Sequence, residues 1–291
     1  MAKQRELKNI YKSIKPYVKE VAQSTLVNPD FYKIALRAAL AKTYDFNSYV
    51  TGLTSSSHSF YHTATLRGIC EDLIVLKAVK EIPNPDRSDL IKYLQLKETF
   101  EAMTTQAKFF QTNHPQIVLD EEFANTHSDN EFDKALAIYK QYGFPRGRYG
   151  PTIKSLAQRA DLAEVYEFFY AATSKWVHFS RHILMRMGWT TKTNTEPLTK
   201  ATYTYTTKHF SDYYAGFNAV YGSYLFGLFC ESLEAELGLN PKMKKYLEEL
   251  GLWIGSLMRW PELITFEEMN IKRPSLILQA LYNVTKGYTE T

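Results

Sequence analysis

Apolar residues recur at helical rather than alternating spacing in nearly every segment of this chain. Proline, glycine and capping residues mark the boundaries between the segments. The first segment shows the pattern with Leu7, Ile10, Ile14, Val18 and Val21. The sequence therefore predicts an all-α fold, a bundle of roughly 9–11 helices. We expect a single helical domain over residues 1–291, with a core at about 29–187 and a C-terminal helical extension at about 206–291.

Several helix boundaries follow from local signals. We expect Pro16 to kink or break the first helix, and Asn28 with Pro29 to begin the second as N-cap and first helical residue. A third helix is expected to open in T-S-S-S-H-S-F-Y-H and to run to about Lys80. The run H-S-D-N at 127–130 should interrupt a later amphipathic segment. Further expected features are an exposed loop from Gly188 to Tyr205, an apolar helix at about 209–237 and a last helix that begins at Pro274.

Composition excludes several classes of protein. With 45% hydrophobic and 23% charged residues, the chain can form a proper core and is not disordered. A net charge of +4 permits a nucleic-acid partner without demanding one. Cys70 and Cys230 lie in apolar stretches, which favours buried free thiols and a reducing cytoplasm. The uncharged run from Tyr213 to Cys230 contains three glycines and four tyrosines, so we interpret it as a central buried helix and expect no membrane span.

Four of the seven histidines form two His-x3-His pairs, His58 with His62 and His178 with His182. On one continuous helix, Tyr170, Ser174, His178 and His182 would share a column. If the two segments faced each other, four imidazoles could meet at a metal. No acidic residue falls on the face of the first pair, however, and H-E-x-x-H is absent. We therefore expect unmetallated histidines and no metal or other cofactor.

A charged pair lies within the apolar run L-R-G-I-C-E-D-L-I-V-L. Arg67 and Glu71 are four residues apart, which places both on one face of a helix. Such a pair often belongs only to the solvated face of an amphipathic helix. Gly68 between them favours a functional interpretation, because glycine within a helix costs roughly 1 kcal/mol relative to alanine and is usually kept for close approach. We expect the helix that carries Ser174 and His178 to be the element that approaches.

The combination of Arg67-x3-Glu71 with Tyr170-x3-Ser174-x2-Val177-His178 resembles an uncharacterised family of helical bacterial proteins, over about residues 55–185. That family in turn resembles the HEPN helical bundles, many of which are toxin or antiviral ribonucleases that dimerise to bring an arginine and a histidine together. The resemblance implies a HEPN-like core with Arg67, Glu71, Ser174 and His178 at its centre. HEPN nucleases carry both groups on one helix, whereas here Arg181 follows His178 and Arg67 lies on an earlier segment.

This set of residues suits metal-free RNA cleavage. The reaction needs a base for the 2′-hydroxyl proton and a cation for the charge on the phosphorane. His178 would be the acid or base and Arg67 the cation, while Glu71 orients Arg67 and Ser174 holds the imidazole tautomer. Substrate-binding candidates are His62, Arg146, Arg148, Tyr170, Arg181 and His182, of which Arg146 and Arg148 belong to the loop G-F-P-R-G-R-Y-G-P.

Two other interpretations stay open. The four central residues can form a buried polar network that only fixes helix register. The protein would then be a non-catalytic binding, scaffold or sensor protein, with a partner protein recognised through its tyrosine-rich helix near 203–229. A third possibility is an enzyme with a four-histidine metal site. The partners that we expect are RNA or a nucleotide, and a second copy of the chain or another protein.

Overall fold

The computed structural model describes residues 2–23, 30–113, 121–145, 147, 150–178, 180–190 and 203–264. Almost all regular structure within these residues is helical, which confirms the all-α prediction. The helices are α1 (Ala2–Ala22), α2 (Phe31–Gly52), α3 (Ser59–His62), α4 (Thr65–Val79), α5 (Asp86–Asn113), α6 (Glu121–Gln141), α7 (Ile153–Arg159), α8 (Ala163–Val177), α9 (Arg181–Arg186), α10 (Ser211–Ser232), α11 (Glu234–Leu237) and α12 (Pro241–Gly255).

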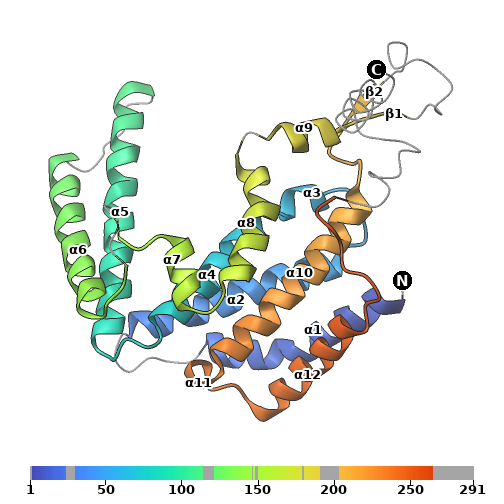
Figure 1. Ribbon diagram of the computed structural model, residues 1–291, viewed down its shortest axis with the longest axis horizontal. Coiled ribbons are helices and arrows are strands. Elements are labelled where there is room, and N and C mark those ends of the chain that lie inside the picture. Colours follow the sequence, from blue (N-terminus) through green and yellow to red (C-terminus); the bar gives the residue numbers. More distant parts are fainter. Residues whose placement is uncertain are drawn as a thin grey trace, which may run out of the picture.

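Helix α10 runs through the middle of the helical body and packs against α2, α3, α4 and α12 (Figure 1). Its sequence is apolar around the whole circumference, as expected for a helix with neighbours on several sides. Phe226, Phe229 and Cys230 are completely buried. This confirms the interpretation of the uncharged run as a central buried helix. Neither α10 nor any other helix in the described part of the chain is long and apolar enough to cross a bilayer.

Helices α10 and α2 approach each other closely at Gly222. A Cβ atom at Gly222 would lie 2.6 Å from Asn47 Oδ1 and 2.8 Å from Phe46 Cε1, so only glycine fits without movement. The amide of Asn47 uses this proximity, since Nδ2 donates to the carbonyl of Gly222 at 3.0 Å. Sequence reasoning placed the close approach at Gly68 and did not identify Gly222.

Tyrosines fill much of the core, and their hydroxyls are bonded inside it. The buried Tyr11 donates to Ser223 Oγ at 3.0 Å, and Tyr44 donates to the carbonyl of Tyr11 at 3.0 Å. Tyr32 donates to the carbonyl of Leu76 at 3.1 Å. These bonds offset the cost of burying each phenol, so a tyrosine-rich core is stable without access of the hydroxyls to water.

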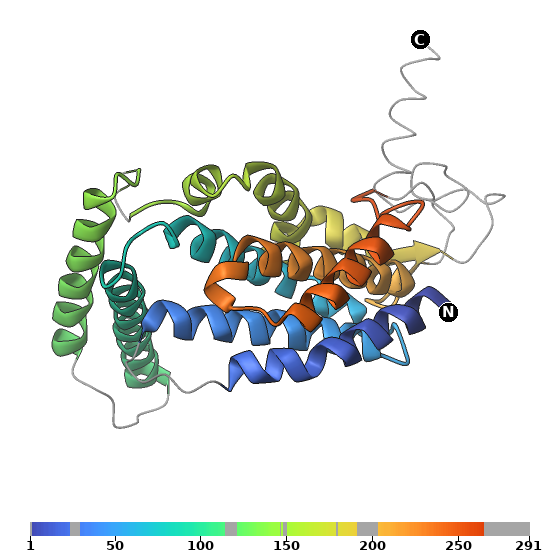
Figure 2. The same cartoon turned by 90° about the horizontal axis from the view of Figure 1, so that it is seen from below.

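Helices α5 and α6 form an antiparallel hairpin that stands away from the rest of the bundle (Figures 1 and 2). It joins the body through contacts of α5 with α2. The predicted interruption at 127–130 is wrong, because α6 continues through these residues. Packing along α5 explains the continuity: Ser128 and Glu131 are buried in the hairpin, and tertiary contacts override the weak helix propensity of His-Ser-Asp-Asn.

Two other boundaries differ from prediction, and Pro16 does not break α1, which continues through it. The N-cap of α2 is Asp30, whose carboxylate accepts from the backbone N–H of Lys33 at 3.1 Å, whereas 28–29 lie outside the described residues. The expected loop 188–205 contributes two strands at its ends, β1 (Gly188–Thr190) and β2 (Tyr203–Tyr205), which pair antiparallel. The expected helix from Pro274 lies outside the described residues.

The expected third helix is divided into α3 and α4. At the junction, Leu66 N donates to Thr63 O and Arg67 N to Ala64 O, both at 3.3 Å, and these bonds span three residues instead of four. The carbonyl of Ser59 accepts from the side chain of Asn218 on α10 at 2.8 Å. This bond from α10 anchors α3 separately, so α4 starts as a new helix at Thr65 and its first turn carries Arg67.

Candidate functional site

Arg67 of α4 and His178 at the end of α8 lie in contact. Arg67 Nη1 is 3.4 Å from His178 Nε2, a distance at which the guanidinium can donate to a neutral imidazole nitrogen. Helices α4 and α8 pack against each other along their length (Figure 1), so the pair is held by two supported elements. The side chain of Arg67 is 25% exposed and His178 is exposed. A ligand in solution can therefore reach both groups.

His178 takes this position because α8 ends one residue before it. Val177 is the last helical residue, and His178 has extended backbone angles, φ −120° and ψ 162°. The predicted column of Tyr170, Ser174, His178 and His182 is therefore broken after Ser174. If α8 continued through His178, the imidazole would follow the rotation of the helix. The extended backbone of His178 instead directs the imidazole towards Arg67. His182 belongs to the separate helix α9.

Glu71 holds the guanidinium of Arg67. Arg67 Nε donates to Glu71 Oε1 at 2.8 Å within one turn of α4. This hydrogen bond to Glu71 raises the pKa of Arg67, so its positive charge is retained at any physiological pH. The bond uses Nε and leaves the terminal nitrogens directed to His178 and to solvent. The orienting contact predicted for Glu71 is formed.

Two neighbouring tyrosines, whose ring planes are tilted by 34°, border the guanidinium. The ring centroids of Tyr166 and Tyr170 are 5.4 Å apart, and the guanidinium carbon of Arg67 lies 5.2 Å from the ring centroid of Tyr170. Tyr170 is 45% exposed, so part of its side chain is open to solvent. Burial raises the pKa of Tyr166, which keeps its hydroxyl protonated. Tyr166 was missed in the sequence, although its spacing of four residues before Tyr170 is a signal that could have identified it.

The hydroxyl of Ser174 does not contact the imidazole. Among the residues that the structure describes, Ser174 Oγ makes no hydrogen bond to His178. The backbone carbonyl of Ser174 instead accepts from the backbone N–H of His178 at 3.2 Å. Ser174 thus fixes the last turn of α8, and the contact predicted for its side chain is not formed.

The remaining predicted residues are dispersed. His62 packs edge-on against Tyr49 of α2 at 5.0 Å, and burial lowers its pKa. Arg181 is exposed at the first residue of α9, and within the described ranges no hydrogen bond joins it to the Arg67–His178 pair. Arg146 and Arg148 lie outside the described residues, so their predicted role in phosphate binding stays a prediction.

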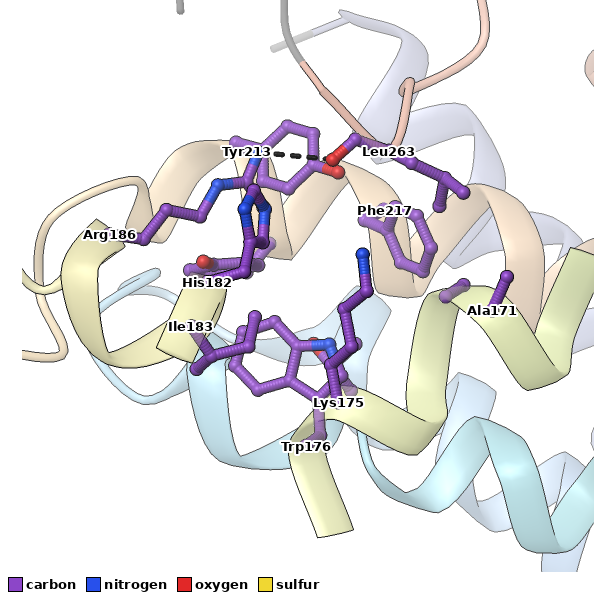
Figure 3. A pocket seen from close by; sticks show the side chains of 12 residues that line it. Ala171, Lys175, Trp176, His182, Ile183, Arg186, Tyr213, Phe217 and Leu263 are labelled. Atoms are coloured by element: carbon purple, nitrogen blue, oxygen red, sulfur yellow. Dashed lines mark hydrogen bonds between the residues drawn. The ribbon is translucent and has the colours of Figure 1, made fainter. Parts of the chain in front are cut away.

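His182 lines a small cleft between α8, α9 and α10 (Figure 3). Lys175 points into this cleft, and the buried guanidinium of Arg186 donates to the carbonyl of Leu263 at 3.2 Å across its edge. The cleft has a volume of about 20 Å³, room for a single water molecule. It is too small for a nucleotide, and Lys175 and Arg186 were not identified in the sequence.

The two His-x3-His pairs do not come together. His58 precedes α3 as its N-cap, His178 follows α8, and His182 belongs to α9. Across the described ranges, no three His, Cys, Asp or Glu side chains are grouped as metal ligands would be. The arrangement of four imidazoles that a metal enzyme would need is therefore not formed by these residues.

Gly68 is approached from α2 and not from α8, contrary to expectation. A Cβ atom at Gly68 would lie 3.3 Å from Lys42 Nζ. Lys42 donates to Asp72 Oδ2 at 2.7 Å, so a second ion pair follows Arg67–Glu71 along α4. Burial raises the pKa of the Asp72 carboxyl even though Lys42 lowers it. The small residue at 68 thus makes room for the side chain that pairs with Asp72.

The comparisons with known proteins give a family but no activity. Residues 53–195 match the model of a family described as a family of unknown function (DUF5677). The matched span is just under half of the chain and includes both Arg67–Glu71 and Tyr170–His178. No curated protein and no solved structure matches the chain. The chain is therefore similar to this family over the two helices that form the candidate site.

Proposed function

We propose that this protein is a metal-independent endoribonuclease of HEPN-like type that acts in toxicity or antiviral defence in the cytoplasm. The proposal rests mainly on the contact between Arg67 and His178, which come from helices distant in sequence and lie at a solvent-accessible surface. A partly exposed guanidinium beside an exposed imidazole supplies the two groups that metal-free RNA cleavage requires.

In the proposed reaction the neutral imidazole of His178 takes the proton of a ribose 2′-hydroxyl. The 2′-oxygen attacks the adjacent phosphorus, and the charge that develops on the phosphorane oxygens is stabilised by the terminal nitrogens of Arg67. The bond from phosphorus to the 5′-oxygen breaks, and the imidazolium returns its proton to that oxygen. The products are a 2′,3′-cyclic phosphate and a 5′-hydroxyl. Glu71 is a positioning residue that keeps the fork of Arg67 directed to the phosphate.

The two tyrosines beside Arg67 favour RNA over other phosphate esters. Unpaired bases bind proteins by stacking on exposed aromatic faces, at about 1–3 kcal/mol per base. Tyr170 offers such a face directly beside Arg67. A nucleotide with its base on Tyr170 would therefore have its phosphate near the guanidinium.

The alternative of a purely structural network requires buried groups that satisfy one another. Arg67 and Glu71 have side chains that are 25% and 33% exposed, and His178 is exposed. The bond between Arg67 and Glu71 contributes little to stability at such exposure. A structural role alone therefore gives no physical reason for placing an imidazole against this guanidinium.

The test is cleavage of single-stranded RNA of mixed sequence in the presence of EDTA. Wild type should release fragments that end in 2′,3′-cyclic phosphate. His178→Ala should lower the rate by about 10²-fold or more, and Arg67→Ala by about 10²–10³-fold. His58→Ala is the matched control, because His58 is exposed and makes no capping hydrogen bond. Intact RNA with wild type, or equal rates for His178→Ala and His58→Ala, would refute the proposal.

We also propose that the protein forms a homodimer, and this is tested apart from cleavage. Sedimentation of the purified protein should give the mass of two chains. A monomer that still cleaves RNA would refute the homodimer but not the proposed chemistry of Arg67 and His178.

A further inference from the structure

A groove lies next to Glu71, the partner of Arg67, between the body and α5 of the hairpin. It is formed by α2, α4, α5 and the first residue of α7, and its volume is about 660 Å³. We call its eight small or aliphatic lining residues the floor, and its five charged or polar lining residues the rim: Lys42, Glu71, Asp72, Gln95 and Glu98. Of the rim, Lys42, Gln95 and Glu98 are exposed. A volume in this range is typical of sites for small organic ligands.

We propose that this groove binds a guanine base of the RNA whose phosphate lies at Arg67. The proposal rests on the proposed ribonuclease function and adds a base preference to it. It is carried by three observations: the groove shares Glu71 with the catalytic pair, its rim is acidic, and its floor is apolar.

Glu71 connects the groove with Arg67. One carboxylate oxygen accepts from Arg67, and the same residue lines the groove. Asp72 follows immediately and Val75 one helical turn later, so the groove extends from Glu71 along α4. A nucleotide anchored by its phosphate at Arg67 therefore has the groove within reach of its base.

Charge excludes a phosphate from the groove and favours a base with hydrogen-bond donors. Three carboxylates and one ammonium line it, so an anion is repelled. Glu71 and Asp72 already accept from Arg67 and Lys42. Glu98 has no hydrogen bond or ion pair with any other described residue. Its ionised carboxylate has only acceptor oxygens, so its natural partner is a pair of N–H groups.

Guanine is the base that presents such a pair. Its Watson–Crick edge places the N1–H and N2 amino donors side by side, followed by the O6 acceptor. A carboxylate accepts both donors at once, and an ammonium such as that of Lys42 can donate to O6. Adenine, cytosine and uracil each put an acceptor next to their donor on this edge, so a carboxylate would meet a lone pair.

The floor suits the faces of a base. Small side chains of α2 leave the space open, and branched aliphatic side chains of α4 and α5 border it. Ala38 is exposed in the groove, so a larger side chain there would fill the space without disturbing the core.

Binding of mononucleotides to the His178→Ala variant tests the groove separately from cleavage. Isothermal titration should show guanosine 5′-monophosphate binding about tenfold or more tightly than the adenosine, cytidine and uridine monophosphates. Inosine 5′-monophosphate lacks the N2 amino group and should also bind about tenfold more weakly. Adding Glu98→Gln or Ala38→Trp should abolish the preference for guanine. Glu101→Gln is the matched control, because Glu101 lies on the same helix but pairs with Lys97 and is 54% exposed.

Equal affinity for all four nucleotides, or equal effects of Glu98→Gln and Glu101→Gln, would overturn the inference. Sequencing of the cleavage ends separates the two proposals. Cleavage without a preference for sites next to guanosine would refute the guanine site but not the ribonuclease proposal. Selective binding of guanosine monophosphate without RNA cleavage would support the groove as a guanine-nucleotide site and refute the ribonuclease proposal.

Discussion

Replacing single glycines of α10 by alanine gives a direct test of how this helix packs. At Gly222 the new methyl group would lie 2.6 Å from Asn47 Oδ1 and 2.8 Å from Phe46 Cε1, distances that Cβ atoms do not adopt. At Gly227, five residues further along the same helix, no atom lies within 4 Å of the added carbon. The same chemical change is therefore made once in a crowded site and once in an open one.

The expected changes in the free energy of unfolding have opposite signs. Alanine gains roughly 1 kcal/mol over glycine in a helix interior, and Gly227→Ala should keep this gain. At Gly222 the gain is outweighed by overpacking, which costs about 1–3 kcal/mol. Asn47 Nδ2 also donates to the carbonyl of Thr43 at 2.8 Å, so losing the bond to the carbonyl of Gly222 leaves one N–H of the buried amide without a partner, at a cost of about 1–3 kcal/mol. Gly222→Ala should thus be less stable than wild type by about 1–5 kcal/mol.

Equilibrium unfolding in urea, followed by far-ultraviolet circular dichroism, measures both variants. The two should differ by about 2 kcal/mol or more, with Gly227→Ala the more stable. If Gly222→Ala unfolds at the same urea concentration as Gly227→Ala, or at a higher one, the close contact between α10 and α2 does not exist as described.

Three other outcomes follow from the core and from α4. Tyr11→Phe leaves the buried hydroxyl of Ser223 without its donor and should cost about 1–3 kcal/mol, and a double-mutant cycle with Ser223→Ala should show coupling between the two residues. Burial raises the pKa of the Cys230 thiol, so a disulfide reagent at pH 8 should modify it only in denaturant, and rapid modification of the native protein would contradict its burial. Burial also raises the pKa of the Asp72 carboxyl despite Lys42, so the folded state disfavours the ionised form at neutral pH, and this penalty disappears as the pH falls through the raised pKa. Asp72→Asn should therefore gain stability over wild type at pH 7, and a gain that persisted unchanged at about pH 4 would contradict this reasoning.

The helical class could be predicted because it depends on local information. Apolar spacing, Pro241 at the first turn of α12 and the capping Thr152 of α7 are visible in the sequence, and the structure has helices at these places. The pairing of Arg67 with Glu71 is equally local, since it needs only one helical turn. Such features depend on few neighbouring residues.

The features that could not be predicted depend on packing between distant segments. The end of α8 before His178 has no proline or glycine signal, because Val177, His178 and Phe179 are all compatible with a helix. The crossing at Gly222 was missed because its partner, Asn47, is 175 residues away in the sequence. Helix α6 passes through His-Ser-Asp-Asn only because α5 lies alongside it.

The order of the elements along the chain affects how the protein is made. Helix α10 begins at Ser211, and it covers faces of α2, α3 and α4 that are all synthesised earlier. During translation α2, α3 and α4 remain without their central neighbour until α10 is made, and the apolar faces that it covers stay open to water. A ribosome that stalls shortly before codon 211 would therefore hold a nascent chain that is a natural substrate for chaperones.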